Sequence, residues 1–270
     1  MIGAAGDHGG TGNAVDVSIS LVISAHNEAA NLPHVLTRIP DIVDEVLLVD
    51  GHSVDDTVSV AQAILPEIRV LQQPGSGRGT ALACGCAAAT GDIIVMLDAG
   101  GLTDPAEIPH FVDALLDGSD FAKGSRYVTG GRTAGNRLLN AAVNVLFRTC
   151  YTDLCYGYNA FWRRCLPDLR ISVSGFEVET LMPIRVARAG LRVTEVPSVE
   201  YARIFAESKR KVVREGLHVL SVIVRERLRP HRRHLARWDS PQPSFHELTS
   251  PAGSETPDPG RNVLFETDGA

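Results

Sequence analysis

The most constraining feature of this chain is an alternation of short apolar runs with segments of helical periodicity. The apolar runs cover residues 17–23, 45–49, 69–71 and 92–97, and the helical segments cover residues 31–39, 55–65, 80–89 and 105–116. Strands that alternate with helices form a mostly parallel sheet, and the helices then cover both of its faces. The sequence therefore predicts a single α/β domain of the Rossmann-like type.

The two ends of the chain differ in composition from its middle. Residues 1–16 are Gly-rich and polar, and residues 236–270 are rich in Pro, Ser, Asp and Glu with little apolar periodicity. Such segments bury too little apolar surface to offset the entropy lost on ordering. Both are therefore predicted to be flexible or disordered tails, and the folded domain is predicted to span residues 17–235.

The net charge and the cysteine content exclude some functions and predict where the protein is located. The formal net charge of −6 argues against general nucleic-acid binding, which needs a basic surface. The five Cys residues fit no zinc-binding spacing, no signal-peptide pattern opens the sequence, and no apolar run is long enough for a membrane span. These features predict a cytoplasmic protein with reduced thiols.

Polar residues and tight turns follow the predicted strands, and ligands of such sheets bind at the carboxyl ends of strands. The candidate residues are Ala25, Asn27 and Glu28 after the first strand, Asp50, Ser53 and Asp55 after the second, Arg78 and Gly79 after the third, and Asp98 and Ala99 after the fourth. Carboxylates accept hydrogen bonds from ribose, a Gly-rich turn lets backbone approach phosphate, and Arg neutralises phosphate. The combination predicts a nucleotide site in which Asp98 acts through a divalent metal.

Each of these features also has a purely structural interpretation. Ser53, Asp55 or Asp56 can cap the helix that follows, and Asp104, just before Pro105, suits an N-cap better than a metal ligand. The Gly-rich turn at residues 75–79 can be only a flexible connection, since it does not follow the first strand as a dinucleotide-binding fingerprint would.

The order of these motifs resembles that of the inverting family 2 of glycosyltransferases, which have the GT-A fold. The resemblance covers about residues 18–215 and is carried by residues 22–28, Asp50 with Ser53 and Asp55, Arg78-Gly79, residues 124–131, residues 175–179, residues 188–191, residues 195–197 and residues 207–209. The segments from residue 124 onward are similar to the polyprenyl- and dolichol-phosphate sugar synthase branch. The resemblance implies transfer of a sugar, with inversion, from a nucleotide-sugar donor to an acceptor.

One position departs from the pattern of that family. The family has Asp-x-Asp after the fourth strand, and its second Asp contacts the metal, whereas this chain has Asp98-Ala99-Gly100. Three explanations remain for the implied cofactor, Mg²⁺ or Mn²⁺. Asp98 holds the metal with another group such as Asp104, or arginines neutralise the diphosphate in its place, or the protein is catalytically impaired. The candidate arginines are Arg78, Arg126 and Arg137.

The acceptor is expected to be either a lipid phosphate or a hydroxyl. A polyprenyl phosphate is already anionic and needs cations, and the resemblance assigns its phosphate to Arg137, although Ala141 replaces the usual Ser or Thr nearby. A hydroxyl acceptor needs a general base. The candidates for that base are Glu177, Glu179 and Asp153, whose structural alternative is an ordinary surface or capping carboxylate.

An aromatic cluster and a basic segment complete the candidates. Tyr151, Tyr156 and Tyr158 are hypothesised to shape acceptor choice, whereas Phe161 and Trp162 are predicted to fill the core. Residues 203–233 carry ten Lys or Arg against three Glu, with Leu217, Leu220, Val224 and Leu228 near helical spacing. This basic amphipathic helix either contacts the inner face of a membrane peripherally or packs on the domain as an ordinary solvated helix.

Two other functions compete with sugar transfer. A sugar nucleotidyltransferase would carry a Gly-rich, Arg-containing loop directly after its first strand, where this chain has residues 25–28, Ala-His-Asn-Glu. A non-catalytic or impaired nucleotide-sugar-binding protein is suggested by Gly100. Sugar transfer is the favoured interpretation because the motifs that resemble family 2 glycosyltransferases occur in order over about residues 18–215.

Overall fold

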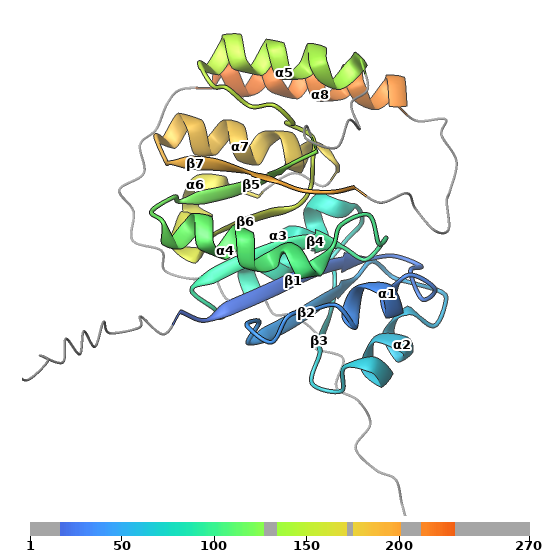
Figure 1. The fold of residues 1–270 in the computed structure, drawn as a ribbon. Helices are drawn as coiled ribbons and strands as arrows, with labels where there is room; N and C mark the ends of the chain where they lie inside the picture. Colours follow the sequence, from blue (N-terminus) through green and yellow to red (C-terminus); the bar gives the residue numbers. More distant parts are fainter. Residues whose placement is uncertain (1–16, 127–133, 172–174, 201–211, 230–270) are drawn as a thin grey trace, which may run out of the picture.

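The computed structural model describes residues 17–126, 134–171, 175–200 and 212–229 (Figure 1). The predicted tails at 1–16 and 236–270 lie outside these ranges, as do residues 203–211 and 230–233 of the predicted basic helix. The domain boundaries predicted from composition therefore stay predictions.

A seven-stranded sheet forms the centre of the molecule, with strand order β3-β2-β1-β4-β6-β5-β7. The strands are β1 (Ile19–Ala25), β2 (Glu45–Asp50), β3 (Arg69–Gln72), β4 (Ile93–Asp98), β5 (Phe121–Ser125), β6 (Asn159–Trp162) and β7 (Val193–Pro197). Strands β1 to β4 pair in parallel, β6 runs antiparallel to both β4 and β5, and β7 is parallel to β5. The predicted mostly parallel α/β sheet is confirmed.

Helices cover both faces of this sheet, as the continuous apolar runs of the strands require. The helices are α1 (Leu32–Leu36), α2 (Thr57–Ile64), α3 (Arg78–Ala88), α4 (Ile108–Leu116), α5 (Ala134–Phe147), α6 (Leu166–Leu169), α7 (Glu177–Ala189) and α8 (Val212–Leu228), with short 3-10 turns at Pro105–Glu107 and Arg163–Cys165. One buried cluster joins α1, α2 and α4 to one face, and a second joins α3, α6 and α7 to the other.

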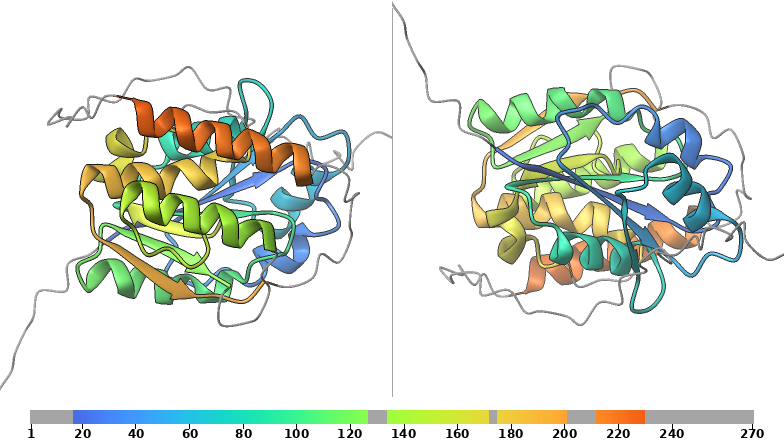
Figure 2. Two further views of the ribbon diagram at one scale, coloured as in Figure 1. Left: turned by 90° about the horizontal axis from the view of Figure 1, so that it is seen from above. Right: turned by 90° about the horizontal axis from the view of Figure 1, so that it is seen from below.

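Helices α5 and α8 form a further layer on the outside of α7 (Figures 1 and 2). A third buried cluster holds this layer, with Val143 of α5 and Ile223 of α8 against Ile184 of α7. The described helices of this chain include none that is both long and apolar enough to cross a membrane.

The ends of the elements differ from the predicted ends by a few residues. The helix predicted at 31–39 is a short helix, Leu32–Leu36, and the one predicted at 80–89 begins earlier, at Arg78. The predicted cap at Asp104 is confirmed, because its carboxylate accepts a hydrogen bond from the Ala106 N–H at 3.0 Å. Its other carboxylate oxygen is paired with Arg38, so Asp104 is built into the scaffold.

The five cysteines are free thiols with very different surroundings. Cys150 is exposed, whereas Cys84, Cys86 and Cys165 are buried. Burial raises the pKa of Cys84 to about 11 and that of Cys165 to about 12, which suppresses the reactive thiolate. We therefore expect Ellman's reagent at pH 8 to label Cys150 rapidly and the buried thiols only after unfolding. Rapid labelling that persists in a Cys150→Ser variant would contradict this.

Candidate active site

The carboxyl ends of β1, β2 and β4 meet at one edge of the sheet. Ala25 on β1 lies opposite Asp50 on β2, and Ser24 on β1 lies opposite Asp98 on β4. Directly after β4, the buried Ala99 donates its N–H to the Ser24 carbonyl at 3.1 Å. The parallel register therefore places the two candidate carboxylates, Asp50 and Asp98, on either side of β1.

The turns that follow β1 and β2 are hydrogen-bonded to each other. The Asn27 N–H donates to Ser53 Oγ at 2.9 Å, and Asn27 Oδ1 accepts from the Val54 N–H at 2.8 Å. Asn27 has a φ of 55°, a left-handed conformation that Asn tolerates better than most residues. The buried Asp50 accepts from the Ser53 N–H at 3.1 Å, so these residues form one connected rim.

Asp55 and Glu28 are built into the same rim. Asp55 accepts hydrogen bonds from the N–H groups of Ala29 and Thr57, each at 3.1 Å. Burial alone would raise the pKa of Asp55, but bonds from Thr57 and Ala29 outweigh it and lower that pKa. The Glu28 N–H donates to Thr57 Oγ1 at 2.9 Å, so Thr57 ties both predicted residues together.

The start of α2 decides between the predicted N-caps. The N-cap is Asp56, one of the predicted alternatives beside Ser53 and Asp55, and its side chain makes no capping hydrogen bond. Asp55 reaches the Thr57 N–H from one position further upstream, while Ser53 accepts from the turn after β1. Asp55 therefore bonds the first turn of α2, whereas Ser53 bonds the neighbouring turn.

Arg78 is the first residue of α3, and its guanidinium lies at the edge between β1 and β4. Its NH1 donates to Ser24 Oγ at 3.1 Å and lies 3.6 Å from Asp98 Oδ2. Its Nε lies 2.6 Å from Glu179 Oε1 of α7, and both side chains are largely buried. Burial alone would lower the pKa of Arg78, but Glu179 and then Asp98 outweigh it and raise that pKa. A charged guanidinium is therefore held beside Asp98.

The backbone of Gly157 lies close to the Arg78–Glu179 pair. Arg78 NH2 is buried and has no hydrogen-bond partner among the described residues. A Cβ added at Gly157 would stand 2.7 Å from Arg78 NH2 and closer than van der Waals contact to Glu179 Oε1. The Arg78–Glu179 pair therefore occupies the space that a side chain at this position would take. Gly79, the next residue along α3, is itself buried.

The described residues do not fit a divalent metal held by protein ligands. Asp98 accepts from the Gly100 N–H at 2.9 Å through one oxygen, and its other oxygen faces Arg78. Gly100 has no side-chain ligand, and Asp104 is engaged by Arg38 and its own helix. Within the described ranges no group of three or more His, Cys, Asp or Glu side chains could hold a metal ion. Asp98 is thus a lone carboxylate with a cation already beside it.

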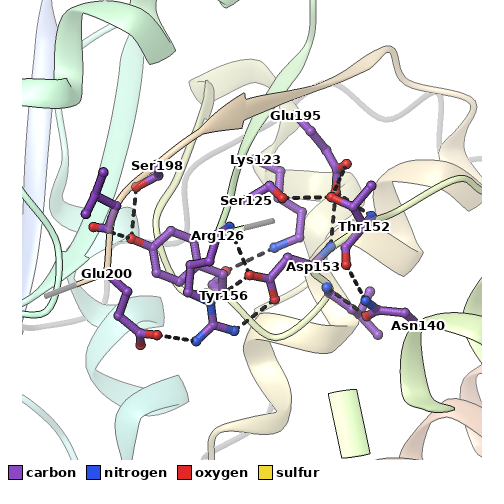
Figure 3. Close-up of polar contacts among 12 residues, drawn as sticks. Lys123, Ser125, Arg126, Asn140, Thr152, Asp153, Tyr156, Glu195, Ser198 and Glu200 are labelled. Atoms are coloured by element: carbon purple, nitrogen blue, oxygen red, sulfur yellow. Dashed lines mark hydrogen bonds and ion pairs between the residues drawn. The ribbon is translucent and has the colours of Figure 1, made fainter. Parts of the chain in front are cut away.

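A second polar network surrounds Arg126, directly after β5 (Figure 3). Its Nε and NH2 donate to the two oxygens of Asp153 at 2.6 and 2.8 Å, and its NH1 donates to Glu200 at 2.8 Å. The guanidinium also lies over the Tyr156 ring, 4.8 Å from the centroid. Two carboxylates already compensate Arg126, so the structure favours a scaffold role over the predicted contact with phosphate. The same pairing argues against Asp153 as a free general base.

Removing the Arg126–Asp153 ion pair is expected to change the stability of the fold and its dependence on pH. Burial alone would raise the pKa of Asp153, but Arg126 outweighs it and lowers that pKa. A lowered carboxylate pKa stabilises the fold above the unfolded-state pKa, and this contribution is lost as the pH falls through the folded-state pKa. We expect Arg126→Met to lower the free energy of unfolding by about 3 kcal/mol at pH 7, because it leaves Asp153 buried and uncompensated.

Urea unfolding of the wild type and the variant between pH 7 and pH 3 measures this effect. The difference between the two proteins is expected to shrink below about pH 4, where Asp153 in the unfolded chain takes up a proton. Arg164→Met, which removes the ion pair between the exposed Arg164 and the partly buried Asp120, is the control and should cost less than about 1 kcal/mol. A cost for Arg126→Met that did not change with pH would contradict the ion-pair explanation.

Lys123 of β5 is a buried residue that the sequence analysis missed. It is fully buried, and its Nζ donates to the Tyr156 carbonyl at 3.0 Å (Figure 3). Burial lowers the pKa of Lys123, and nearby carboxylates, chiefly Asp153, oppose that change. Because Gly157 follows Tyr156, Lys123 anchors the loop that borders the Arg78–Glu179 pair. The available signal was a lone Lys inside an otherwise small and apolar strand.

Two predicted site residues lie apart from this group. Arg137 is on α5, where it is exposed and has no hydrogen bond or ion pair with another residue of the described ranges. Glu177 is the first residue of α7, and its carboxylate accepts from the Gly175 N–H at 3.3 Å. A carboxylate at this position stabilises the positive end of a helix. Glu177 therefore holds the turn that precedes α7 and lies at the positive end of that helix.

The hypothesis that tyrosines shape acceptor choice is wrong for the described structure. Tyr151, Tyr156 and Tyr158 are all buried, with at most 6% of their surface exposed. Each hydroxyl has a partner inside the fold: the Pro183 carbonyl, Ser198 Oγ and the Asp104 carbonyl, respectively. They are core residues with satisfied hydroxyls. Phe161 is fully buried as predicted, and Trp162 packs against the core while partly exposed.

Comparison with solved structures defines the class of this fold. Glucosyl-3-phosphoglycerate synthase from Mycobacterium tuberculosis in complex with phosphoglyceric acid superposes with a TM-score of 0.66 at 26% identity, over 79% of this chain and 81% of that one. A complex of that enzyme with Mn²⁺, UDP-glucose and phosphoglyceric acid gives the same score and identity over the same shares. The fold is therefore the GT-A type of glycosyltransferases.

Sequence comparison then gives the family. Residues 20–165 match the model of glycosyl transferase family 2, and this chain belongs to that family. A dolichol-phosphate mannosyltransferase from Pyrococcus furiosus is 33% identical over 123 residues, which cover 43% of this chain and 35% of that protein. An undecaprenyl-phosphate 4-deoxy-4-formamido-L-arabinose transferase from Aeromonas hydrophila is 32% identical over 146 residues, covering 48% and 45%. The chain thus spans less than half of the length of these relatives.

Proposed function

We propose that this protein transfers a sugar from a nucleoside diphosphate sugar to a polyprenyl phosphate, with inversion at the anomeric carbon. The observation that carries the proposal is the buried Arg78 guanidinium at the carboxyl edge of the sheet, 3.6 Å from Asp98 and fixed by Glu179. The edge that holds this group also carries the linked rim of Asn27, Asp50 and Ser53.

The rim and Arg78 have separate tasks in the proposed donor site. The rim around Asp50 receives the base and ribose, through hydrogen bonds to carboxylate and backbone groups. Arg78 stabilises the charge that develops on the leaving diphosphate. Its position is set before the donor binds, so no free energy is lost in reorienting the guanidinium during the reaction. Glu179 acts as a positioning residue, because it touches Arg78 rather than the proposed substrate.

The chemical step is an in-line displacement. An oxygen of the acceptor phosphate forms a bond to the anomeric carbon as the bond to the diphosphate oxygen breaks, and the nucleoside diphosphate leaves with that electron pair. An anionic phosphate acceptor needs no general base, which agrees with the engagement of Asp153 by Arg126 and of Glu179 by Arg78. The named relatives from Pyrococcus furiosus and Aeromonas hydrophila support this class of acceptor.

Metal use is the second part of the proposal. Gly100 offers no side-chain ligand, and the carboxylate of Asp98 already faces Arg78. We therefore expect nucleotide binding to persist without a divalent metal, although the Mycobacterium tuberculosis synthase was crystallised with Mn²⁺.

Calorimetric titration of UDP and GDP, with and without Mn²⁺, tests the donor site. One nucleotide is expected to bind the wild type in both conditions. Its affinity should fall at least about tenfold in Arg78→Met, because a buried charge-assisted contact is lost. Arg164→Met removes an exposed Arg elsewhere and is the control. Transfer to undecaprenyl phosphate is then followed by mass spectrometry with the sugar form of the nucleotide that binds.

Each other outcome has a distinct meaning. Binding that requires Mn²⁺ and is lost in Asp98→Ala would show that Asp98 holds a metal after all. Nucleotide binding without any transfer would favour the non-catalytic nucleotide-sugar-binding protein. Absence of binding by either nucleotide in all conditions would overturn the donor-site proposal.

A further inference from the structure

A pocket opens in the outer helical layer, where α5 and α8 end. It has a volume of about 370 Å³ and is lined by Leu146, Phe147, Arg148, Arg188, Arg227 and Arg229. Both helices pack on α7 and lie side by side on the outside of the molecule (Figure 2). The ends of α5 and α8 supply most of this lining, and Arg188 of α7 completes it. The pocket therefore joins an apolar wall to four guanidinium groups.

The arginines of this pocket exceed the carboxylates that can compensate them. None of the lining residues is an Asp or Glu. The buried Glu226 of α8 is already shared by two of the lining arginines, Arg188 and Arg229. Arg148 and Arg227 are exposed, and neither guanidinium has a hydrogen-bonded or ion-paired partner among the described residues. These two guanidinium groups are thus available to an anion.

The ends of the two helices do not account for the free guanidinium groups. Carbonyl groups at a helix C-terminus attract cations. Arg188 meets this need at the end of α8, because it donates to the Arg229 carbonyl at 2.8 Å and also to the Glu226 carbonyl. Arg148 and Arg227 make no such contact within the described ranges. Their place beside an apolar wall fits an acidic ligand that also carries apolar side chains.

The chain itself contains a segment of that chemistry, in the part that follows α8 and lies outside the described ranges. Residues 238–270 hold six acidic residues, at positions 239, 247, 255, 258, 266 and 268, and one basic residue, Arg261. The longest apolar run in this stretch is Val-Leu-Phe at residues 263–265, and Glu266 and Asp268 follow it closely. Residues 263–268 therefore combine apolar side chains with two carboxylates, as the pocket requires. We call residues 263–268 the acidic segment.

The covalent connection favours this segment over a separate partner. The acidic segment begins 34 residues after Arg229, which itself lines the pocket. A flexible connection of that length keeps the segment at an effective concentration on the order of 1 mM near the pocket. An intrinsic Kd of about 0.1 mM would then hold about nine chains in ten in the docked state. Modest complementarity is therefore enough for docking within one chain.

We propose that the acidic segment docks in the pocket at the ends of α5 and α8 of its own chain. The apolar run packs on Leu146 and Phe147, and the two carboxylates bind Arg148 and Arg227. Docked in this way, the segment is an intramolecular counterion that competes with other anions for these arginines. A symmetric contact with a second copy is disfavoured, because it would place the arginines of one pocket against those of the other. The inference goes beyond the proposed function, since it requires no donor and no transfer.

A disulfide trap in the full chain tests the docking. Cys150 is an exposed free thiol two residues after Arg148. In a Thr267→Cys variant the new thiol lies between the two carboxylates of the acidic segment, so docking brings it close to Cys150. Mild oxidation at low salt and low micromolar protein should form an intramolecular disulfide, identified by mass spectrometry of tryptic peptides. A Cys150→Ser background should abolish this product.

Thr249→Cys is the matched control, because it places a thiol in the same stretch of chain but outside the acidic segment. An undocked chain predicts that Thr249→Cys reacts about threefold faster than Thr267→Cys, because the shorter loop closes more often. Docking predicts the reverse order, with Thr267→Cys faster by at least about tenfold. Raising the salt concentration to about 0.5 M should remove that advantage, because it screens the exposed charges.

Charge variants in the Thr267→Cys background locate the contact. Arg148→Gln/Arg227→Gln and Glu266→Gln/Asp268→Asn should each slow the disulfide at least about tenfold, since each removes one side of the charge-assisted contacts. Arg164→Gln/Arg192→Gln removes two exposed arginines elsewhere and should keep the unmodified rate. The variants should melt within a few degrees of the wild type, because the altered side chains of the described domain are exposed.

Three results would overturn the proposal. Thr267→Cys reacting no faster than Thr249→Cys would show that the acidic segment does not dock near Cys150. An undiminished rate in Arg148→Gln/Arg227→Gln would show that the pocket does not hold the segment. Disulfide-linked dimers in place of the intramolecular product would show that the segment binds a second copy. None of these results depends on nucleotide binding or transfer, so they leave the proposed function to its own test.

Discussion

Replacing Glu179 by leucine is expected to lower the free energy of unfolding by about 3–5 kcal/mol, because it leaves the buried Arg78 guanidinium without its nearest anion. Asp98 lies farther away, at 3.6 Å, so it replaces only part of the lost ion pair with Glu179. Urea unfolding at pH 7 measures the change. Transfer activity should be lost with stability, since Arg78 no longer has a fixed position.

A double variant separates stability from function. In Arg78→Met/Glu179→Leu both charges are gone and apolar side chains fill the space, so most of the lost stability should return. Nucleotide binding should not return, because the proposed phosphate contact is absent. A single Glu179→Leu variant that costs less than about 1 kcal/mol would show that Glu179 does not hold Arg78. A double variant that binds nucleotide as the wild type does would remove Arg78 from the donor site.

Gly157→Ala is expected to reduce transfer by about 100-fold, because a shift of about 1 Å in a positioned catalytic group has effects of that size. The added Cβ would lie 2.7 Å from Arg78 NH2 and would displace the Arg78–Glu179 pair. The cost in stability should be smaller, about 1–3 kcal/mol, as is usual for overpacking. Steady-state kinetics with the natural donor and urea unfolding measure the two effects.

A second-site change tests the cause of the loss. Glu179→Asp shortens the side chain that the new methyl group meets, so Gly157→Ala/Glu179→Asp should recover part of the activity lost in Gly157→Ala. Gly75→Ala is a control for stability alone, because its Cβ would stand 3.6 Å from Thr80 Cγ2, an ordinary contact. Wild-type activity in Gly157→Ala would contradict the role given to this close approach.

The sheet and its ligand edge were predictable because they follow from local patterns. Continuous apolar runs such as those of β1 and β4 require helices on both faces, and parallel strands end at a common edge. The positions of Asp50 and Asp98 then follow from strand ends, without knowledge of any distant contact. Helix ends were less predictable, since the start of α2 at Thr57 depends on hydrogen bonds from the turn after β1.

The roles of individual charged residues were harder to predict from the sequence, because the role of a charged side chain depends on which residues lie next to it in the folded structure. In the sequence Arg78 and Arg126 are equally good candidates for binding the diphosphate, because both are arginines close to glycines. In the structure Arg126 is paired with two carboxylates and Arg78 lies beside Asp98 at the ligand edge. The three tyrosines were likewise hypothesised to shape acceptor choice, whereas the structure buries all three in the core.

The sequence alone determined the α/β class, the alternation of strands and helices in the first half of the chain and the set of residues at the carboxyl edge, because all of these depend on periodicity and on what directly follows a strand. Only the tertiary structure brought Glu179 of α7 to Arg78 of α3, set Gly157 against both, and placed α5 beside α8. These contacts join segments far apart in the chain. Their free energy comes from burial and charge pairing across that separation, which no local pattern encodes.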